Sequence, residues 1–302
     1  REAAKTLPRE AGLTYSAWSM ELTTRLMQAA SWLVMQKAVR DGEMRREDAA
    51  ARKYRIHREE PPLDAAAQQV TCDAGVVLQT LHEAAEAEGL RFPLTLGGKG
   101  SATIGGLVST NAGGTQVLRH GTMRAQVLGL ESVLADGSVF SNLVPLKKDN
   151  RGFDLKQLLI GSEGTLGIVT GATLRLLPAT ADRRVVWAGL KSISAARDLL
   201  RHCEEVAGSA LEGFEVLPAH CLESVLAYLP DARAPLAENH AWHALIEVVT
   251  ENRESEHLDQ IVEQMFETAM ERGLAENAVV AASEAQAEAF WHLRESISPA
   301  ER

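Results

Sequence analysis

Glycine is concentrated in two short segments of this 302-residue chain. Residues 97–114 and 161–171 together hold 11 of the 23 glycines, although the two segments make up only 29 residues. Lys99 and Glu163 are their only charged side chains. Glycine exposes main-chain amides and lets the backbone approach a ligand closely. The distribution favours two side-chain-poor turns, used either to hold a ligand such as a diphosphate or a flat ring, or simply to connect strands.

The common nucleotide-binding fingerprints are absent from both segments, because neither GxGxxG after a strand nor GxxxxGK[ST] occurs there. Apolar residues make up 45% of the chain and charged residues 24%, which is typical of a soluble globular protein of about two domains. No apolar run is long enough to span a membrane, and residues 1–9 do not resemble a signal peptide. The three cysteines are far apart and form no CxxC pair, so we expect a reducing, cytoplasmic location.

The net charge of −10 is unevenly distributed. Residues 1–60 hold 12 Lys or Arg and 9 Asp or Glu, so the remaining residues hold 31 − 12 = 19 basic and 41 − 9 = 32 acidic side chains. An acidic body argues against nucleic acid as a partner, because binding phosphates requires clustered cations. The basic residues between Arg45 and Arg58 are interleaved with acids and are typical of a solvated helix face.

Residues 1–60 are expected to form a helical segment with two helices, over 13–40 and 43–58. Trp18, Leu22 and Leu26 recur at helical spacing, and Gly42 favours the end of the first helix. The pair Pro61-Pro62 then prevents helix continuation, and we place a domain boundary there.

A β-α-β alternation is predicted after that boundary, followed by a β-rich segment and an α+β region. The expected strands cover 69–74, 90–96, 127–134, 138–140, 214–217 and 243–249, and the expected helices cover 77–88, 192–206 and 257–272. Asp136-Gly137 is a hairpin turn signal between two of these strands. The pair His240-x-x-His243 has no third ligand at a matching spacing, so it is interpreted as a loop followed by the start of a strand.

Three sequence blocks resemble FAD-linked oxidases of the vanillyl-alcohol-oxidase type. They are IGGLVSTNAGG within 104–114, KDNRGFDLKQL over 148–158 and GSEGTLGI over 161–168. The branch they are most similar to contains the D-lactate, glycolate and D-2-hydroxyglutarate dehydrogenases, and the resemblance runs from about residue 63 to 302. It implies an α+β fold with the second half of an FAD-binding domain over 61–180 and a partial, ferredoxin-like substrate domain over 181–302.

The resemblance also implies FAD as the cofactor and places the residues that would hold it. The residues that would line the diphosphate and flavin are Gly98, Gly100, Ser101, Ile104, Gly105, Gly106, Thr110, Asn111, Gly113 and Gly114. Lining the adenosine and ribityl side would be Gly161, Glu163, Gly164, Gly167 and Ile168. The segment WHLRESIS over 291–298 is similar to the family's substrate segment, so Arg294 would pair with a substrate carboxylate and Ser298 would assist. Taken without the resemblance, an Arg beside a Glu on a helix is more often a surface ion pair.

Two parts of the family pattern are not found in this sequence. One is an early Gly-rich loop that grips the FAD diphosphate, and the other is a downstream His-containing segment that supplies metal ligands and the base. Residues from about 7 to 58 instead resemble a small alphaproteobacterial helical family that includes the regulator of CtrA degradation, an adaptor in regulated proteolysis. We therefore expect weak or no turnover from this chain by itself.

Two hypotheses follow from these observations. The first is an FAD-dependent oxidoreductase, or a piece of one, that passes a hydride from a D-2-hydroxy acid to flavin and electrons onward to a quinone or carrier protein. The second is a non-catalytic helical adaptor fused to a flavoenzyme remnant. Because half a cofactor domain would leave apolar sheet and strand edges uncovered, we also expect a homodimer or aggregation unless residues 13–58 cover that face.

Overall fold

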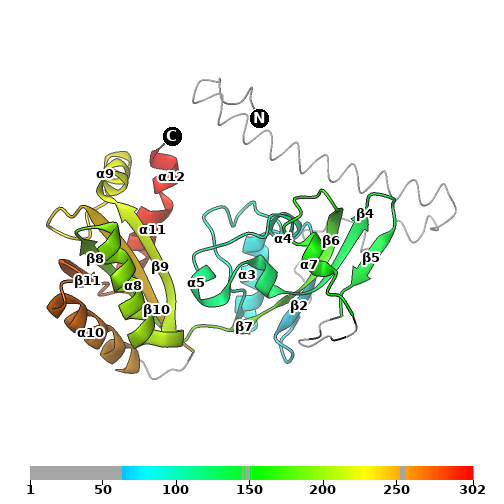
Figure 1. The fold of residues 1–302 in the computed structure, drawn as a ribbon, viewed down its shortest axis with the longest axis horizontal. Helices are drawn as coiled ribbons and strands as arrows, with labels where there is room; N and C mark the ends of the chain where they lie inside the picture. The colour runs from blue at the N-terminus through cyan, green and yellow to red at the C-terminus, as the bar shows by residue number, and fades with distance from the viewer. Residues whose placement is uncertain (1–62, 145, 147–149, 151, 252–255, 302) are drawn as a thin grey trace, which may run out of the picture. The chain divides into compact units, whose positions relative to one another are not determined.

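The computed structural model describes residues 63–144, 146, 150, 152–251 and 256–301 (Figure 1). Their backbone clusters into two compact units. Within the described residues, the first unit comprises 63–92, 98–112 and 122–177, and the second comprises 93–97, 113–121 and 178–301. The helices predicted over 13–58 lie outside the described residues.

The first unit is built on a five-stranded antiparallel sheet with the strand order β1-β2-β6-β4-β5. The predicted hairpin is confirmed, since β4 pairs with β5 across a turn in which Gly137 has a φ of 85°. A left-handed backbone of that kind is accessible to glycine at little cost. The strands are β1 (Leu63–Asp64), β2 (Gln69–Asp73), β4 (Val127–Leu134), β5 (Val139–Asn142) and β6 (Gly167–Arg175).

Short helices connect the strands of the first unit. The predicted helix after β2 is confirmed as α3 (Leu78–Ala87), and its chain reverses at Gly89, which has a φ of 68°. Its buried face contains leucines and alanines at helical spacing, as the sequence pattern required. The other helices are α4 (Ile104–Ser109), α6 (Met123–Gln126) and α7 (Lys156–Leu159).

The strand predicted over 90–96 is wrong beyond its first two residues. β3 covers only Leu90–Arg91 and pairs with β7 (Leu177–Pro178). Further along, the backbone of Thr95 bonds to a loop instead of a strand: its amide donates to Oε1 of Gln116 at 2.7 Å, and its carbonyl accepts from the amide of Thr115 at 3.0 Å. The apolar side chains of 92–94 are buried, which is why the run looked strand-like in sequence.

The second unit is a four-stranded antiparallel sheet with the order β11-β8-β10-β9. The strands predicted over 214–217 and 243–249 are confirmed and are longer than expected. The prediction missed the central strand β8, although it contains a run of apolar residues buried on both faces. The strands are β8 (Asp182–Leu190), β9 (Leu211–Pro218), β10 (Trp242–Thr250) and β11 (Asn277–Val280).

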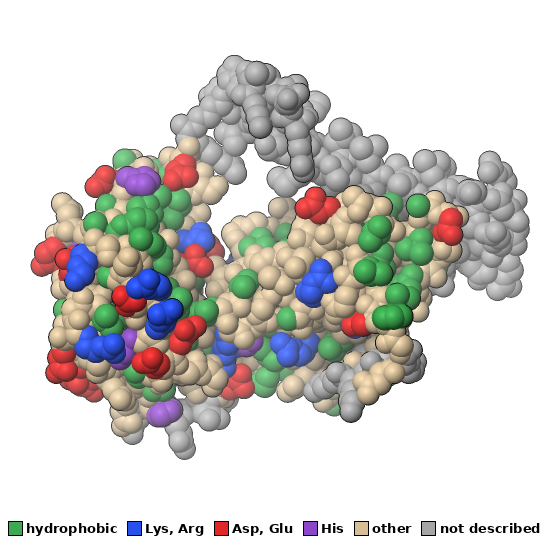
Figure 2. Space-filling view, viewed as in Figure 1, with side chains coloured by type: hydrophobic (Ala, Val, Ile, Leu, Met, Phe, Trp, Pro, Cys, Tyr) green, Lys and Arg blue, Asp and Glu red, His purple; other side chains and the backbone are tan. Residues whose placement is uncertain are grey.

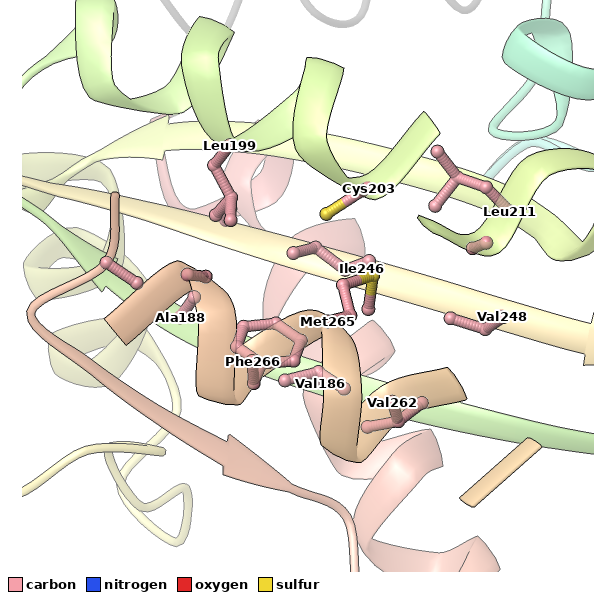
Figure 3. Close-up of a cluster of buried hydrophobic side chains, with 14 of the residues drawn as sticks. Val186, Ala188, Leu199, Cys203, Leu211, Ile246, Val248, Val262, Met265 and Phe266 are labelled. Atoms are coloured by element: carbon pink, nitrogen blue, oxygen red, sulfur yellow. The ribbon is translucent and has the colours of Figure 1, made fainter. Parts of the chain in front are cut away.

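Helices cover both faces of the second sheet. On one face, α8 (Ile193–Ala207) and α10 (Glu256–Glu271) enclose a buried hydrophobic cluster that includes Cys203, Met265 and Ile246 (Figure 3). Both helices were predicted from their apolar spacing, and the Ser192 hydroxyl caps the first by accepting from the amide of Ala195 at 3.1 Å. The opposite face packs under α9 (Ala219–Tyr228), α11 (Glu284–Glu295) and α12 (Ile297–Ala300). The unit also contains α5 (Val117–His120) and the short helix η3 (Gly208–Ala210).

The α+β prediction is therefore confirmed for both units. All three cysteines are buried and free. Among the described residues, no helix combines the length and apolar character that a membrane crossing requires.

Candidate cofactor and substrate sites

The two glycine-rich segments meet within the first unit. The amide of Gly161 donates to the carbonyl of Val108 at 3.0 Å, and the amide of Glu163 donates to the carbonyl of Ser109 at 2.8 Å. These bonds fasten the turn that follows α7 to the C-terminal end of α4. The positive φ values of Gly161 and Glu163, 78° and 51°, turn the chain sharply at this junction. The structure thus places side by side two turns that are about 50 residues apart in sequence.

Arg124 stabilises this junction through hydrogen bonds, and the sequence analysis did not predict a role for this residue. Its guanidinium donates to the carbonyls of Gln157 and Ile160 at 2.6 Å and 2.5 Å, and its amide donates to Oδ1 of Asn111 at 3.0 Å. Asn111 itself has a φ of 48°, a conformation that asparagine tolerates better than most side chains. The partners lie 33 and 36 residues from Arg124, so no local pattern could have indicated the contact.

Backbone carbonyls of the turn before α4 accept hydrogen bonds from the start of α3. The carbonyl of Lys99 accepts from the amide of Gln79 at 3.0 Å, and the carbonyl of Ala102 accepts from the amide of Leu78 at 2.8 Å, so the turn lies against the start of α3. Residues 97–101 are exposed. Within the described part of the chain, the amide of Gly100 has no protein acceptor, and a Cβ at that position would meet open space. This backbone is accessible to a ligand.

The predicted cofactor residues separate into an exposed set and a buried set. Gly98, Gly100, Ser101, Thr110, Gly161, Glu163 and Gly164 are exposed. Ile104 is fully buried, and Gly105 and Gly167 are interior. A Cβ on Gly105 would stand 2.7 Å from Cβ of Ala74, and one on Gly167 would stand 2.7 Å from Oγ of Ser132. These two glycines therefore allow close packing within the unit, whatever else they contribute.

The remaining predicted residues are intermediate in burial or belong to the second unit. Gly106, Asn111 and Ile168 are partly buried. Gly113 and Gly114 fall in the second unit, where a Cβ on Gly114 would stand 2.3 Å from the carbonyl oxygen of Thr95. Such an approach of two backbones is possible only for glycine. The cofactor role of all these residues stays a prediction.

The donor set of the first unit fits a dinucleotide cofactor. The adjoining turns present exposed, uncharged backbone, and Oγ of Ser162 is buried without a hydrogen-bond partner among the described residues. A buried hydroxyl without a partner is costly unless a ligand or water satisfies it. Main-chain amides and neutral hydroxyls of this kind are suited to diphosphate and flavin oxygens.

The predicted substrate residues lie in the second unit. Arg294 on α11 contacts Glu215 on β9, with its Nε and Nη2 both 2.7 Å from the same oxygen, Oε2. About a third of the Arg294 side chain, 36%, remains exposed. Ser298 is exposed on α12. Arg294 is thus an ion-paired residue reaching across to the sheet, and its predicted role toward a substrate stays a prediction.

Two further carboxylates, one partly buried and one buried, lie on neighbouring strands of the same unit, and neither was predicted. Glu247 on β10 contacts Nη1 of Arg183 at 3.2 Å, and Arg183 also contacts the carboxylates of Glu284 and Glu288 on α11. Burial raises the pKa of Glu247, although Arg183 counteracts the shift. The signal that sequence reasoning could have used is a single carboxylate within an otherwise apolar strand.

Glu212 at the start of β9 is 2% exposed, and its partners are on α5, the helix that follows the first glycine-rich segment. Its Oε2 lies 2.7 Å from Nη1 of Arg119 and 3.4 Å from Nε2 of His120. A buried carboxylate requires such partners, since an uncompensated charge would be strongly destabilising. Residues 113–121 are therefore attached to the second unit through an ion pair.

The His240-x-x-His243 pair is a loop followed by a strand residue, as interpreted from sequence. Nδ1 of His240 contacts Oε2 of Glu276 at 2.9 Å, and Nδ1 of His243 accepts from the indole of Trp187 at 3.1 Å. Each ring therefore has a protein partner in the second unit.

Comparison with known protein families agrees with this architecture. Residues 61–141 match the model of the FAD binding domain, and residues 179–302 match that of the FAD linked oxidases, C-terminal domain. Residues 1–86 match DUF1465, a family of unknown function. FAD is the cofactor that these two domains indicate.

Curated relatives are similar over most of the chain. D-2-hydroxyglutarate dehydrogenase from Bos taurus mitochondria is 39% identical over 233 residues, 76% of this chain and 42% of the relative. The same enzyme from Xanthomonas citri is 37% identical over 247 residues, 81% of this chain and 51% of the relative. The chain thus spans about half the length of the curated relatives it matches.

A solved structure of alkyldihydroxyacetonephosphate synthase superposes with a TM-score of 0.59 at 16% identity, covering 82% of this chain and 46% of that one. This likeness concerns the fold alone. The two domain matches and the curated relatives agree with each other: the chain contains an FAD binding domain and a C-terminal domain of the FAD linked oxidases.

Proposed function

We propose that this chain is part of an FAD-dependent dehydrogenase that oxidises a D-2-hydroxy acid, and that the acid is D-2-hydroxyglutarate rather than lactate or glycolate. The observation that carries the proposal is the similarity to D-2-hydroxyglutarate dehydrogenases from animals, plants and bacteria, at 37–39% identity over about 230–250 residues. The donor set of the first unit, which fits a dinucleotide, supports the cofactor assignment.

FAD, when bound, supplies the acceptor for the hydride that leaves the hydroxyl-bearing carbon. The chain's own contribution on that side is to hold the cofactor. Exposed amides such as that of Gly100 would bind diphosphate oxygens, and the exposed turn at Gly161–Gly164 would lie along the adenosine and ribityl side. Arg124 would keep the two turns in register, because it fastens the second turn to α6.

On the substrate side, Arg294 would orient the acid. Glu215 accepts from Nε and Nη2, which fixes the plane of the guanidinium and leaves the Nη1 side to a substrate carboxylate. Ser298, about one helical turn further on and exposed, would donate a hydroxyl hydrogen bond to the substrate. The chain's residues would thus bind and orient the hydroxy acid, while a base takes the hydroxyl proton.

The test measures flavin and substrate binding by the full chain. Purified protein loaded with FAD is titrated anaerobically with D-2-hydroxyglutarate, L-2-hydroxyglutarate, D-lactate and glycolate, and the visible flavin spectrum is followed. We expect D-2-hydroxyglutarate to perturb or bleach the flavin at the lowest concentration. A chain that retains no flavin, or that does not distinguish the two enantiomers, would contradict the proposal.

Two arginine variants make the substrate assignment specific. Arg294→Gln is expected to raise the dissociation constant of D-2-hydroxyglutarate by about 10- to 100-fold, the equivalent of losing one or two charge-assisted hydrogen bonds. Arg197→Gln is the matched control, because Arg197 is 61% exposed on α8 and contacts only its neighbour Asp198 in the described structure. Equal effects of both substitutions would show that the loss of charge alone, and not the position of Arg294, lowers the affinity.

The acceptor, the oligomeric state and the location complete the proposal. Electrons would pass from flavin to a quinone or a carrier protein, which reduction of each by the loaded chain would test. A homodimer is supported by the hydrophobic side chains that Figure 2 shows on one face of the first unit. The exposed hydrophobic residues of this unit include Phe153, Leu158 and Leu166, which are 96%, 63% and 52% exposed. Light scattering would test the dimer, and fractionation of the source cells would test the cytoplasmic location.

A further inference from the structure

Three metal-binding side chains converge where α9 and α12 lie side by side in the second unit (Figure 1). His220 and Cys221 occupy the first turn of α9, and Glu301 follows the last residue of α12. Their ligand atoms, a ring nitrogen, the sulfur and a carboxylate oxygen, all lie within 4.8 Å of one another. The oxidoreductase chemistry proposed above uses none of the three.

The distance between two of these atoms is close to the separation of two ligand atoms around one tetrahedral zinc ion. Sγ of Cys221 lies 3.4 Å from Oε1 of Glu301. Zinc–sulfur bonds of about 2.3 Å and zinc–oxygen bonds of about 2.0–2.2 Å, opened to the tetrahedral angle, separate the two ligand atoms by about 3.5–3.7 Å. Thus the sulfur and the oxygen need move apart by only a few tenths of an ångström to bind one ion.

The backbone holds these donors in place. The amide of Glu301 donates to the carbonyl of Ile297 at 3.0 Å, so the helical path continues to the residue that carries the carboxylate. The amide of Ala219 donates to the carbonyl of Ala241 at 3.0 Å, which fixes the start of α9 just before the other two donors. Cys221 is 8% exposed, whereas His220 and Glu301 are exposed, so the donors form a shallow site with a buried sulfur at its base.

We propose that His220, Cys221 and Glu301 bind one divalent transition-metal ion, of which zinc is the best suited, with water in the fourth position. One nitrogen, one sulfur and one oxygen ligand are a donor set typical of tetrahedral zinc, and the thiolate and carboxylate together neutralise the charge of the ion. The ion would tie α9 to α12 across the face of the sheet that they cover.

Binding of the ion is coupled to release of a proton. Without metal, the Cys221 thiol donates a hydrogen bond to Oε1 of Glu301, so its sulfur carries a proton. When the ion binds, the S–H bond breaks, a metal–sulfur bond forms, and one proton leaves to the solvent. Calorimetric titration in two buffers with different ionisation enthalpies should therefore show about one proton released per ion at neutral pH.

Cobalt(II) is the probe that tests the site. Chelator-treated full-length chain is titrated with Co(II), and the near-ultraviolet thiolate-to-cobalt charge-transfer band and the visible bands of tetrahedral cobalt are recorded. We expect both to saturate at one ion per chain and to disappear on addition of zinc. The band requires sulfur coordination, and the chain has three cysteines, so the signal can be assigned by substitution.

Substitutions decide whether these three residues are the ligands. Cys221→Ser should abolish the charge-transfer band, whereas Cys203→Ala, which also removes a buried thiol, should retain it. His220→Gln and Glu301→Gln keep the thiol and are expected to weaken Co(II) binding by at least about tenfold. Far-ultraviolet circular dichroism identifies any variant that fails to fold.

Two exposed residues provide matched controls for the histidine and the glutamate. His257→Gln on α10 and Glu295→Gln on α11 should leave Co(II) affinity unchanged. Absence of a sulfur band in the parent chain, or a band that survives Cys221→Ser, would overturn the proposal. The same would follow if the control substitutions weakened binding as much as His220→Gln and Glu301→Gln do. None of these outcomes depends on flavin or on turnover, so they do not test the proposed dehydrogenase function.

Discussion

His243 is expected to make the second unit sensitive to acid. Its Nδ1 accepts a hydrogen bond from Nε1 of Trp187 at 3.1 Å, and an indole nitrogen can only donate. The imidazole must therefore be neutral, with its proton on Nε2, because a protonated ring has no acceptor. The side chain is 4% exposed, and the ring of His240 lies 6.0 Å away. Burial, with a smaller contribution from His240, lowers the pKa of His243 to about 4.

The sign and size of the effect follow from linkage. The ordinary pKa of 6.5 applies in the unfolded chain, so below that pH the unfolded state binds a proton that the folded state does not. The free energy of unfolding therefore falls as the pH drops from 6.5 to about 4. At about 1.4 kcal/mol per pH unit, the full loss is about 3 kcal/mol, of which about 2 kcal/mol is lost between pH 7 and pH 5.

Urea unfolding of the full chain at pH 7, 6 and 5, followed by tryptophan fluorescence, measures this loss. Trp187 adjoins His243, and Trp242 and Trp291 lie in the same unit, so the signal reports on it. In His243→Gln the amide oxygen can still accept from the indole but does not titrate, and about 2 kcal/mol of the pH dependence should disappear. The reasoning is refuted if the variant and the parent chain lose equal stability between pH 7 and pH 5.

Three other predictions concern the first unit. Gly105→Ala should lower the free energy of unfolding by about 1–3 kcal/mol in a denaturant titration, because its Cβ would stand 2.7 Å from that of Ala74. Gly100→Ala meets open space, so stability should change by less than about 0.5 kcal/mol, while FAD affinity measured by flavin fluorescence should fall at least about tenfold. Arg124→Lys cannot bond to Gln157 and to Ile160 through two separate nitrogens as the guanidinium does, and it should lower both FAD affinity and stability, the latter by about 1–3 kcal/mol. If Gly100→Ala and Gly105→Ala gave the same pattern, the division into exposed and packing glycines would be wrong.

Strongly periodic segments were predictable from sequence, and segments that take their hydrogen bonds from distant residues were not. The helices α8 and α10 and the hairpin β4–β5 follow from apolar spacing and from the Asp136-Gly137 turn, all of which are local. By contrast, Thr95 lies in an apolar run that resembles a strand, yet its hydrogen bonds go to Thr115 and Gln116. Short-range patterns contain no information about such partners.

Composition alone locates the glycine-rich segments, but it does not show the structural role of each glycine. Counting residues gives equal weight to Gly100, which borders open space, and to Gly105, which packs against Ala74. The distinction depends on what lies beside each Cα, and that is fixed by the pairing of α4 with the end of β2. The family resemblance assigns a cofactor-binding role to both glycines. In the structure, close packing against Ala74 is already enough to explain a glycine at position 105.

The charged residues of the second unit show the converse case, in which the sequence contains a signal that local reasoning passes over. Glu215 and Glu247 lie in strands that are mainly apolar, although β9 also contains Glu212. The register of β9 with β10 places Glu247 opposite Gly213, two residues before Glu215. A carboxylate in such a strand requires a cation, since burial without one is costly. The cations come from far along the chain, Arg294 being 79 residues from Glu215. Without the family resemblance, the sequence pattern therefore indicated an ion pair on the helix surface for Arg294. In the structure its partner is the carboxylate of Glu215 on a strand. That partner holds two of the guanidinium nitrogens, and it is this restraint that makes Arg294 suited to present its remaining edge to an acid.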